Sequence, residues 1–118
     1  MATIVLFAMA TSILTFAVAN LRHANDLDSN PLIARINAAS QLNALPGKHV
    51  VLVQYSADHS THAEFVYNGP DIDGQKIVWA FDRGPQADRA LRDYYRDRQF
   101  WLLKPDSPNP RLTRSPAE

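Results

Sequence analysis

The densest group of chemically capable side chains in this sequence lies between residues 58 and 64. It contains two carboxylates and two imidazoles: Asp58, His59, His62 and Glu64. Neutral imidazole nitrogens and carboxylate oxygens are both good zinc ligands. A His-x-x-His spacing, however, is not the i, i+4 spacing at which two histidines on one helix chelate a metal. We therefore interpret His59, His62 and Glu64 as candidate ligand-binding residues in a polar loop and assign no metal to them.

A second polar group follows in a turn and contains Asn68, Asp71 and Asp73. Two carboxylates separated by two positions could bind a divalent cation or a sugar hydroxyl. The pattern departs from a Ca²⁺ loop, which needs more alternating oxygen ligands and a terminal glutamate. Asx residues beside glycine also bond to their own backbone in turns. These three residues complete the candidate ligand-binding set, and a purely structural role in the turn is the alternative.

Other chemistries have weaker support in the sequence. Ser56, Asp58 and His59 are the residue types of a hydrolase triad, but serine and histidine this close on one loop seldom align. The four glycines form no phosphate-binding loop, and the absence of cysteine excludes a thiol nucleophile. Twelve basic and twelve acidic residues balance, which argues against nucleic acid as a partner. We assign no catalytic residue and no cofactor.

The elements that would position these loops predict a small α/β domain over residues 31–104. Pro31 suits the first position of a helix over 31–44, with Leu32, Ile36, Ala39 and Leu42 directed into a core. The continuous β-branched run at 50–53 predicts a central strand that is covered on both faces.

Further strands are predicted at 64–67 and 76–81, as a hairpin, and at 99–103. A charged surface helix over 86–98 precedes the last of them and suggests a right-handed crossover between parallel neighbours. The fold class is therefore α/β, with a three- to four-stranded sheet packed with two helices. Residues 105–118 include four prolines and are predicted to be disordered.

The N-terminal part of the chain is of a different kind. Residues 2–21 form an uncharged apolar run that is long enough to cross a bilayer, so we expect a transmembrane helix over 1–21 and a connector over 22–30. The small residues of Ala17-Val18-Ala19 keep a cleaved signal peptide as the alternative. Arg22, His23 and Arg35 after the run favour, by the positive-inside rule alone, a cytoplasmic domain.

Five segments carry a resemblance to a known family: PGKHVVLVQYS at 46–56, FVYN at 65–68, DIDG at 71–74, VWA at 78–80 and DRQFWL at 97–102. Together they resemble the C-terminal soluble domain, with the last membrane helix, of bacterial polytopic membrane proteins related to the C-type, lipid-linked-sugar glycosyltransferases. The resemblance implies an extracytoplasmic α/β domain in the periplasm, attached to the inner membrane by a single span. In that family the catalytic acidic residue belongs to earlier segments, so no catalytic residue transfers to this chain.

The expected function is therefore a non-catalytic accessory domain and terminal membrane helix of a glycosyltransferase-like protein, of which this chain is a fragment. Its partners would be the lipid bilayer and the other membrane helices of the parent protein, which would be the glycosyltransferase. A free-standing small binding module, membrane-anchored or secreted, is the alternative. A zinc-dependent enzyme that uses His59, His62 and Glu64 is a third hypothesis.

Overall fold

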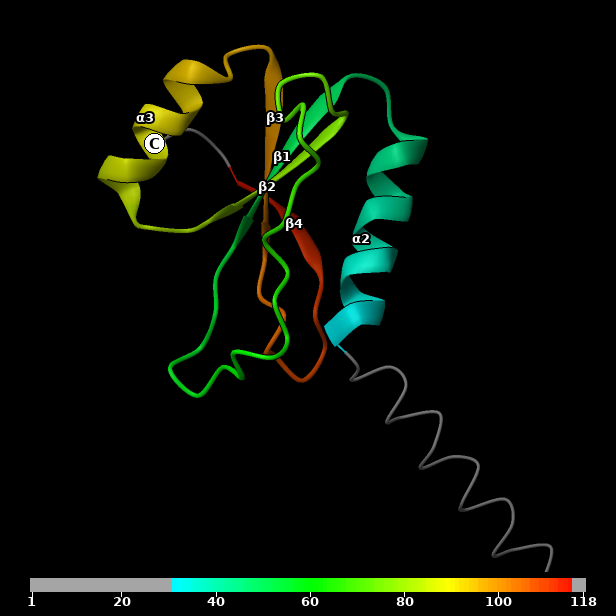
Figure 1. Cartoon of the computed structure of the whole chain (residues 1–118), viewed down its shortest axis with the longest axis vertical. Coiled ribbons are helices and arrows are strands. Elements are labelled where there is room, and N and C mark those ends of the chain that lie inside the picture. Colours follow the sequence, from blue (N-terminus) through cyan, green and yellow to red (C-terminus); the bar gives the residue numbers. More distant parts are fainter. Residues whose placement is uncertain (1–30, 116–118) are drawn as a thin grey trace, which may run out of the picture.

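The computed structural model describes residues 31–115 and shows a mixed α/β fold, with a four-stranded sheet between two helices (Figure 1). Strand β1 pairs in parallel with both β2 and β3, while β4 pairs antiparallel with β3, so that the order is β2-β1-β3-β4. Helix α2 covers one face of the sheet and α3 lies over the other (Figure 1). The elements in chain order are α2 (Pro31–Ala44), β1 (Lys48–Val53), β2 (Ile77–Phe81), α3 (Pro85–Tyr94), β3 (Arg98–Leu103) and β4 (Leu112–Arg114).

Strand β1 is the central strand, as its β-branched run predicts. Residues 50–53 are all buried, because β1 has a hydrogen-bonded neighbour on each side and a helix over each face. Val51 and Val53 belong to the core beneath α2, whereas Val50 and Leu52 belong to the core on the α3 side. The alternation of a strand thus divides one apolar run between two cores.

Helix α2 has the predicted bounds, but a different face of it is buried. Ala34, Ala38 and Leu42 contact the sheet, whereas Leu32 and Ile36 are 56% and 55% exposed. Small alanines at four-residue spacing allow the helix backbone to approach the sheet closely, and this packing turns the larger side chains outward. The predicted stripe was therefore right for Leu42 and wrong for Leu32 and Ile36.

Helix α3 begins at Pro85, after Gly84 at φ 90°, and ends at Tyr94 instead of at Arg98. It ends early because Arg98 is the first residue of β3. No residue within α3 is fully buried. The core on this side is formed mainly by the sheet together with Tyr95, which follows the helix.

The predicted hairpin is wrong, because residues 64–67 form no strand and β2 pairs in parallel with β1. Phe65 is instead buried in the core beneath α2. The guanidinium of Arg35 donates from Nε to the carbonyl of Phe65 at 3.0 Å and lies over the rings of Tyr67 and Trp79. The connection from β2 through α3 to β3 joins parallel strands, but β1 lies between them.

Of residues 105–118, for which the sequence predicts disorder, the structure describes 105–115 and places a strand among them. Pro105 is buried, and β4 extends the sheet by pairing with β3. Leu112 packs against the core beneath α2, which gives this proline-rich segment an apolar anchor.

Across residues 31–115, no helix is long and apolar enough to cross a membrane. The predicted transmembrane helix over 1–21, the connector over 22–30 and residues 116–118 lie outside the described residues.

Candidate functional site

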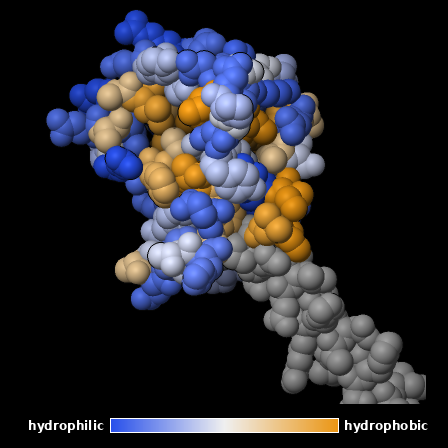
Figure 2. Space-filling model, viewed as in Figure 1, coloured by the Kyte–Doolittle hydropathy of each residue, from blue (hydrophilic) through white to orange (hydrophobic). Residues whose placement is uncertain are grey.

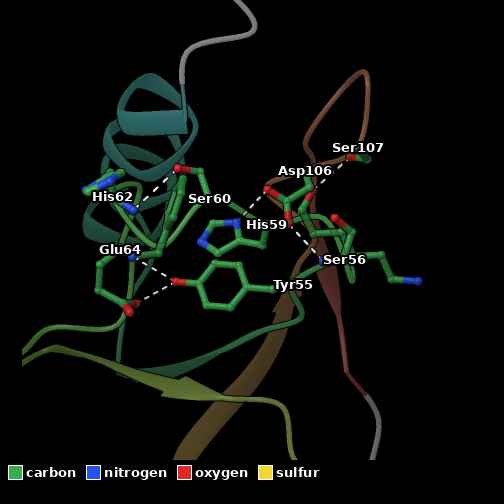
Figure 3. A network of polar contacts seen from close by, with 10 residues as sticks. Tyr55, Ser56, His59, Ser60, His62, Glu64, Asp106 and Ser107 are labelled. Carbon is green, nitrogen blue, oxygen red and sulfur yellow. Dashed lines mark hydrogen bonds and ion pairs between the residues drawn. The ribbon is translucent and has the colours of Figure 1, made fainter.

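The loops that follow β1 and β3 meet at the carboxyl edge of the sheet. The connection after β1 leads to β2 on one side, and the connection after β3 leads to β4 on the other. Neighbouring parallel strands whose connections leave in opposite directions form a topological switch point, and open α/β sheets usually bind ligands in the crevice there. Figure 3 shows a network of polar side chains at this position. We call it the carboxyl-edge cluster: Tyr55, Ser56, His59, Glu64 and Asp106.

Asp106 joins the two loops. Its Oδ1 accepts a hydrogen bond from Nδ1 of His59 at 2.7 Å, and its Oδ2 accepts one from the backbone N–H of Ser56 at 2.8 Å (Figure 3). Burial disfavours the charged carboxylate, but the contacts with His59 and Ser56 outweigh burial and hold the pKa of Asp106 below its ordinary value. Asp106 is therefore ionised at neutral pH and fixes the position of the imidazole.

The ring of Tyr55 packs against the imidazole of His59. The rings of Tyr55 and His59 are stacked, with centroids 3.7 Å apart and planes inclined by 19°. The Tyr55 hydroxyl donates to Oε1 of Glu64 at 2.6 Å and accepts from the N–H of Phe65 at 2.8 Å. Burial, followed by the bond to Glu64, raises the pKa of Tyr55 to about 12. The same hydroxyl, with the N–H of Val66, lowers the pKa of Glu64.

The second imidazole nitrogen of His59 has a different environment. An ionised carboxylate only accepts hydrogen bonds, so Nδ1 carries the proton that points to Asp106. In neutral His59, Nε2 is then an acceptor; it is buried and has no hydrogen-bond partner among residues 31–115. The arrangement is a carboxylate–imidazole pair in which the second nitrogen is a buried hydrogen-bond acceptor with no partner in the described part of the chain.

The other predicted residues of this loop do not join the pair. His62 is exposed, and its backbone N–H donates to Oγ of Ser60 at 3.4 Å. The part of the chain that the structure describes contains no group of three His, Cys, Asp or Glu side chains that could hold a metal ion. The carboxylate partner of His59 is Asp106 rather than Asp58, and Ser56 contributes its backbone, so the hypothetical triad is not assembled.

The three candidate ligand-binding residues of the following turn, Asn68, Asp71 and Asp73, make separate contacts and form no common site. The side-chain amide of Asn68 bonds to the backbone of Trp79, donating to its carbonyl at 2.8 Å and accepting from its N–H at 2.9 Å. Asp71 accepts from the N–H of Gly74 at 3.1 Å, which is ordinary turn chemistry. These contacts account for Asn68 and Asp71 as structural residues.

Asp73 belongs to a second polar group, at the amino edge of the sheet. Its two carboxylate oxygens accept hydrogen bonds from the hydroxyls of Tyr94 and Tyr95, each at 2.7 Å. These two bonds, led by that from Tyr95, lower the pKa of Asp73. We call Asp73, Tyr94, Tyr95 and Arg98 the amino-edge cluster.

Arg98 is the buried member of the amino-edge cluster. Its guanidinium donates to the carbonyls of Asp73 and Gln75, each at 2.7 Å. The Cζ atom of Arg98 lies 4.8 Å from the centre of the Tyr95 ring. Nε of Arg98 has no hydrogen-bond partner within residues 31–115. Arg98 thus holds the turn before β2 against the start of β3.

Sequence reasoning missed both Asp106 and Arg98. Asp106 lies 47 positions after His59, in the segment for which the sequence predicts disorder, and its place shortly after the end of β3 is the signal that could have indicated it. The sequence predicts Arg98 as the end of a charged surface helix, and the apolar run after it is the signal that a strand begins there.

Comparison of the chain with models of protein families, with characterised proteins and with solved structures found no match.

Proposed function

We propose that residues 31–115 form an accessory domain that the apolar run 2–21 holds at a membrane surface, with the carboxyl edge of the sheet facing that surface. The domain would be the extracytoplasmic, non-catalytic part of a glycosyltransferase-like membrane protein. This assignment rests on the resemblance carried by residues 46–56, 65–68, 71–74, 78–80 and 97–102.

One geometric observation carries the orientation. Helix α2 runs antiparallel to β1, so its first residue, Pro31, lies at the same end of the domain as the loops after β1 and β3 (Figure 1). Residues 22–30 join this end to the apolar run, and nine extended residues span at most about 30 Å. If the run is retained in a bilayer, the carboxyl edge is therefore the end held nearest to it.

The surface near Pro31 supports this orientation. Figure 2 shows apolar residues at the surface where the described part of the chain begins. Leu32 and Ile36, one turn apart on α2, are both more than half exposed. Apolar side chains at a membrane interface lose contact with water, which would stabilise this orientation.

The test uses single-cysteine variants, because the chain contains no cysteine. Ala57→Cys lies in the exposed loop after β1, and Asp97→Cys lies at the exposed amino edge. Each variant of the full chain is labelled with a fluorophore and reconstituted in vesicles that contain a lipid with a spin-labelled head group. We expect stronger quenching of the label at position 57 than of the label at position 97.

Equal quenching, or stronger quenching at position 97, would contradict the proposed orientation. Alkaline carbonate extraction of expressing bacteria tests the attachment itself. Retention of the full-length chain in the membrane pellet supports the proposal, whereas release of a chain shortened near Ala19 would establish the secreted binding module instead.

A further inference from the structure

A cavity of about 270 Å³ lies between the sheet and the start of α3, on the opposite side of the sheet from α2. Leu52 of β1 and Leu102 of β3 form its apolar floor. These two strands flank the topological switch point, so the cavity opens beside the position where α/β sheets usually bind ligands. The polar residues of its wall are Gln54, Asp82, Asp88, Arg89, Arg92 and Ser115.

The negative charge of this wall comes from two neighbouring carboxylates. Asp82 accepts from the N–H of Gly84 at 3.0 Å, and Asp88 accepts from the N–H of Arg83 at 3.3 Å. Burial, together with the nearby Asp82, raises the pKa of Asp88. Because the two carboxylates repel each other, a positive group placed beside them would stabilise both charged forms.

Two arginines supply the positive charge of the wall, and they differ in the contacts that their side chains make. Arg92 donates to the carbonyl and to Oγ of Ser115, at 3.1 and 2.6 Å, and lies over the ring of Phe100. The side chain of Arg89 is exposed and forms no hydrogen bond or ion pair with any residue in the range 31–115. Arg89 is therefore the cation that remains available to a ligand.

These charges restrict the chemistry of an occupant. A simple anion would meet Asp82 and Asp88, and a simple cation would meet Arg89, so either would have one unfavourable neighbour. In a small molecule with both an ammonium and a carboxylate group, the ammonium could face the two aspartates while the carboxylate faces Arg89. An apolar substituent on the same molecule would cover Leu52 and Leu102.

We propose that this cavity binds a free α-amino acid with an apolar side chain, whose ammonium group faces Asp82 and Asp88 and whose carboxylate faces Arg89. This proposal concerns a site distinct from the carboxyl-edge cluster and does not depend on membrane attachment. Its failure would therefore leave the proposed function intact.

The test is a titration of the full chain, in detergent micelles, with L-leucine, followed by the NMR signals of the Gly84 and Gln54 backbone amides. We expect saturable shifts of both signals. Two related compounds isolate the charges: 4-methylpentanoate lacks the ammonium group, and leucinamide lacks the carboxylate. We expect each to bind at least about tenfold more weakly, the loss that corresponds to one charge-assisted hydrogen bond.

Variants assign the binding to this cavity. Arg89→Gln should weaken L-leucine about tenfold while leaving leucinamide unchanged, because leucinamide has no carboxylate to lose a partner. Arg96→Gln removes the same charge from an exposed position outside the cavity wall and should bind L-leucine normally. Absence of a saturable shift with L-leucine, or equal binding of 4-methylpentanoate, would overturn the proposal.

Discussion

The two edges of this sheet carry polar clusters of similar size but different construction. In the amino-edge cluster, both oxygens of Asp73 are occupied by tyrosine hydroxyls, and Arg98 is buried against backbone carbonyls. In the carboxyl-edge cluster, Asp106 fixes one nitrogen of His59, and the other is buried without a partner among residues 31–115. A guanidinium only donates hydrogen bonds, whereas a neutral imidazole can also accept one. The comparison indicates that the amino edge stabilises the fold, whereas the carboxyl edge holds a buried imidazole nitrogen that has no partner within residues 31–115.

The strongest test of this division is the removal of Arg98. Arg98→Met leaves the carbonyls of Asp73 and Gln75 without their charged donor, and we expect a loss of about 3 kcal/mol in the free energy of unfolding. Urea denaturation followed by tryptophan fluorescence measures it. Arg96→Met, an exposed control on the preceding turn, should change stability by less than about 0.5 kcal/mol. Similar losses in the two variants would show that the amino-edge cluster does not stabilise the fold.

The second prediction concerns His49, whose carbonyl accepts from Arg98 and whose ring is fully buried. Nδ1 of His49 accepts from the indole N–H of Trp101 at 3.1 Å. Burial first, and then the charge of Lys76, lower the pKa of His49. As the pH falls through about 6.5, His49 therefore takes up a proton in the unfolded chain before it does so in the folded chain.

Stability should consequently be unaffected by His49 above about pH 7 and fall as the pH drops below about 6.5, by up to ~1.4 kcal/mol per pH unit. Urea denaturation at a series of pH values from 7.5 to about 5.5, above the range in which carboxylates titrate, measures this slope. His49→Gln should be less stable at pH 7.5 and show a flatter profile. An unchanged slope in the variant would assign the pH dependence to another group.

The third prediction separates the two adjacent tyrosines. Tyr95 is 8% exposed and Tyr94 is 67% exposed, although both bond to Asp73. Tyr95→Phe should lower the free energy of unfolding by about 1 kcal/mol, because it removes a partly buried hydrogen bond. Tyr94→Phe should cost less, since water replaces the lost partner. Thermal unfolding of both variants compares them, and a larger loss for Tyr94→Phe would reverse the expected order.

The smallest effect on stability is expected at the carboxyl edge. Asp106→Asn retains an acceptor for Ser56 and should cost less than about 1 kcal/mol, because the contact with His59 is partly exposed to solvent. It should nevertheless change the ¹⁵N shifts of the His59 ring, since an uncharged amide no longer fixes the proton on Nδ1. Asp58→Asn serves as the control and should leave these shifts unchanged. Unaltered shifts in Asp106→Asn would mean that Asp106 does not set the tautomer.

Local patterns determined most of the fold that the sequence could predict. The bounds of α2 and the central position of β1 followed from a proline at a helix start and from a continuous β-branched run. The buried face of α2 could not be predicted in this way. Ala34 and Ala38 are only weakly hydrophobic, and they become core residues because the helix packs closely against the sheet. Only part of the candidate site could be predicted from the sequence. His59 was recognised in its polar loop, but its partner Asp106 is brought near it by strand pairing between distant segments.

The bonds of Asn68 to Trp79 have a consequence for how the protein behaves in a crowded solution. Strand β2 is one of the two outer strands of the sheet, and Trp79 is its middle residue. An unpaired outer strand offers its backbone N–H and C=O groups to any extended chain, which is how sheets join into aggregates. The side-chain amide of Asn68 occupies one N–H and one C=O at the centre of that row. A single asparagine thus interrupts the stretch along which a second copy of the chain could otherwise add a strand.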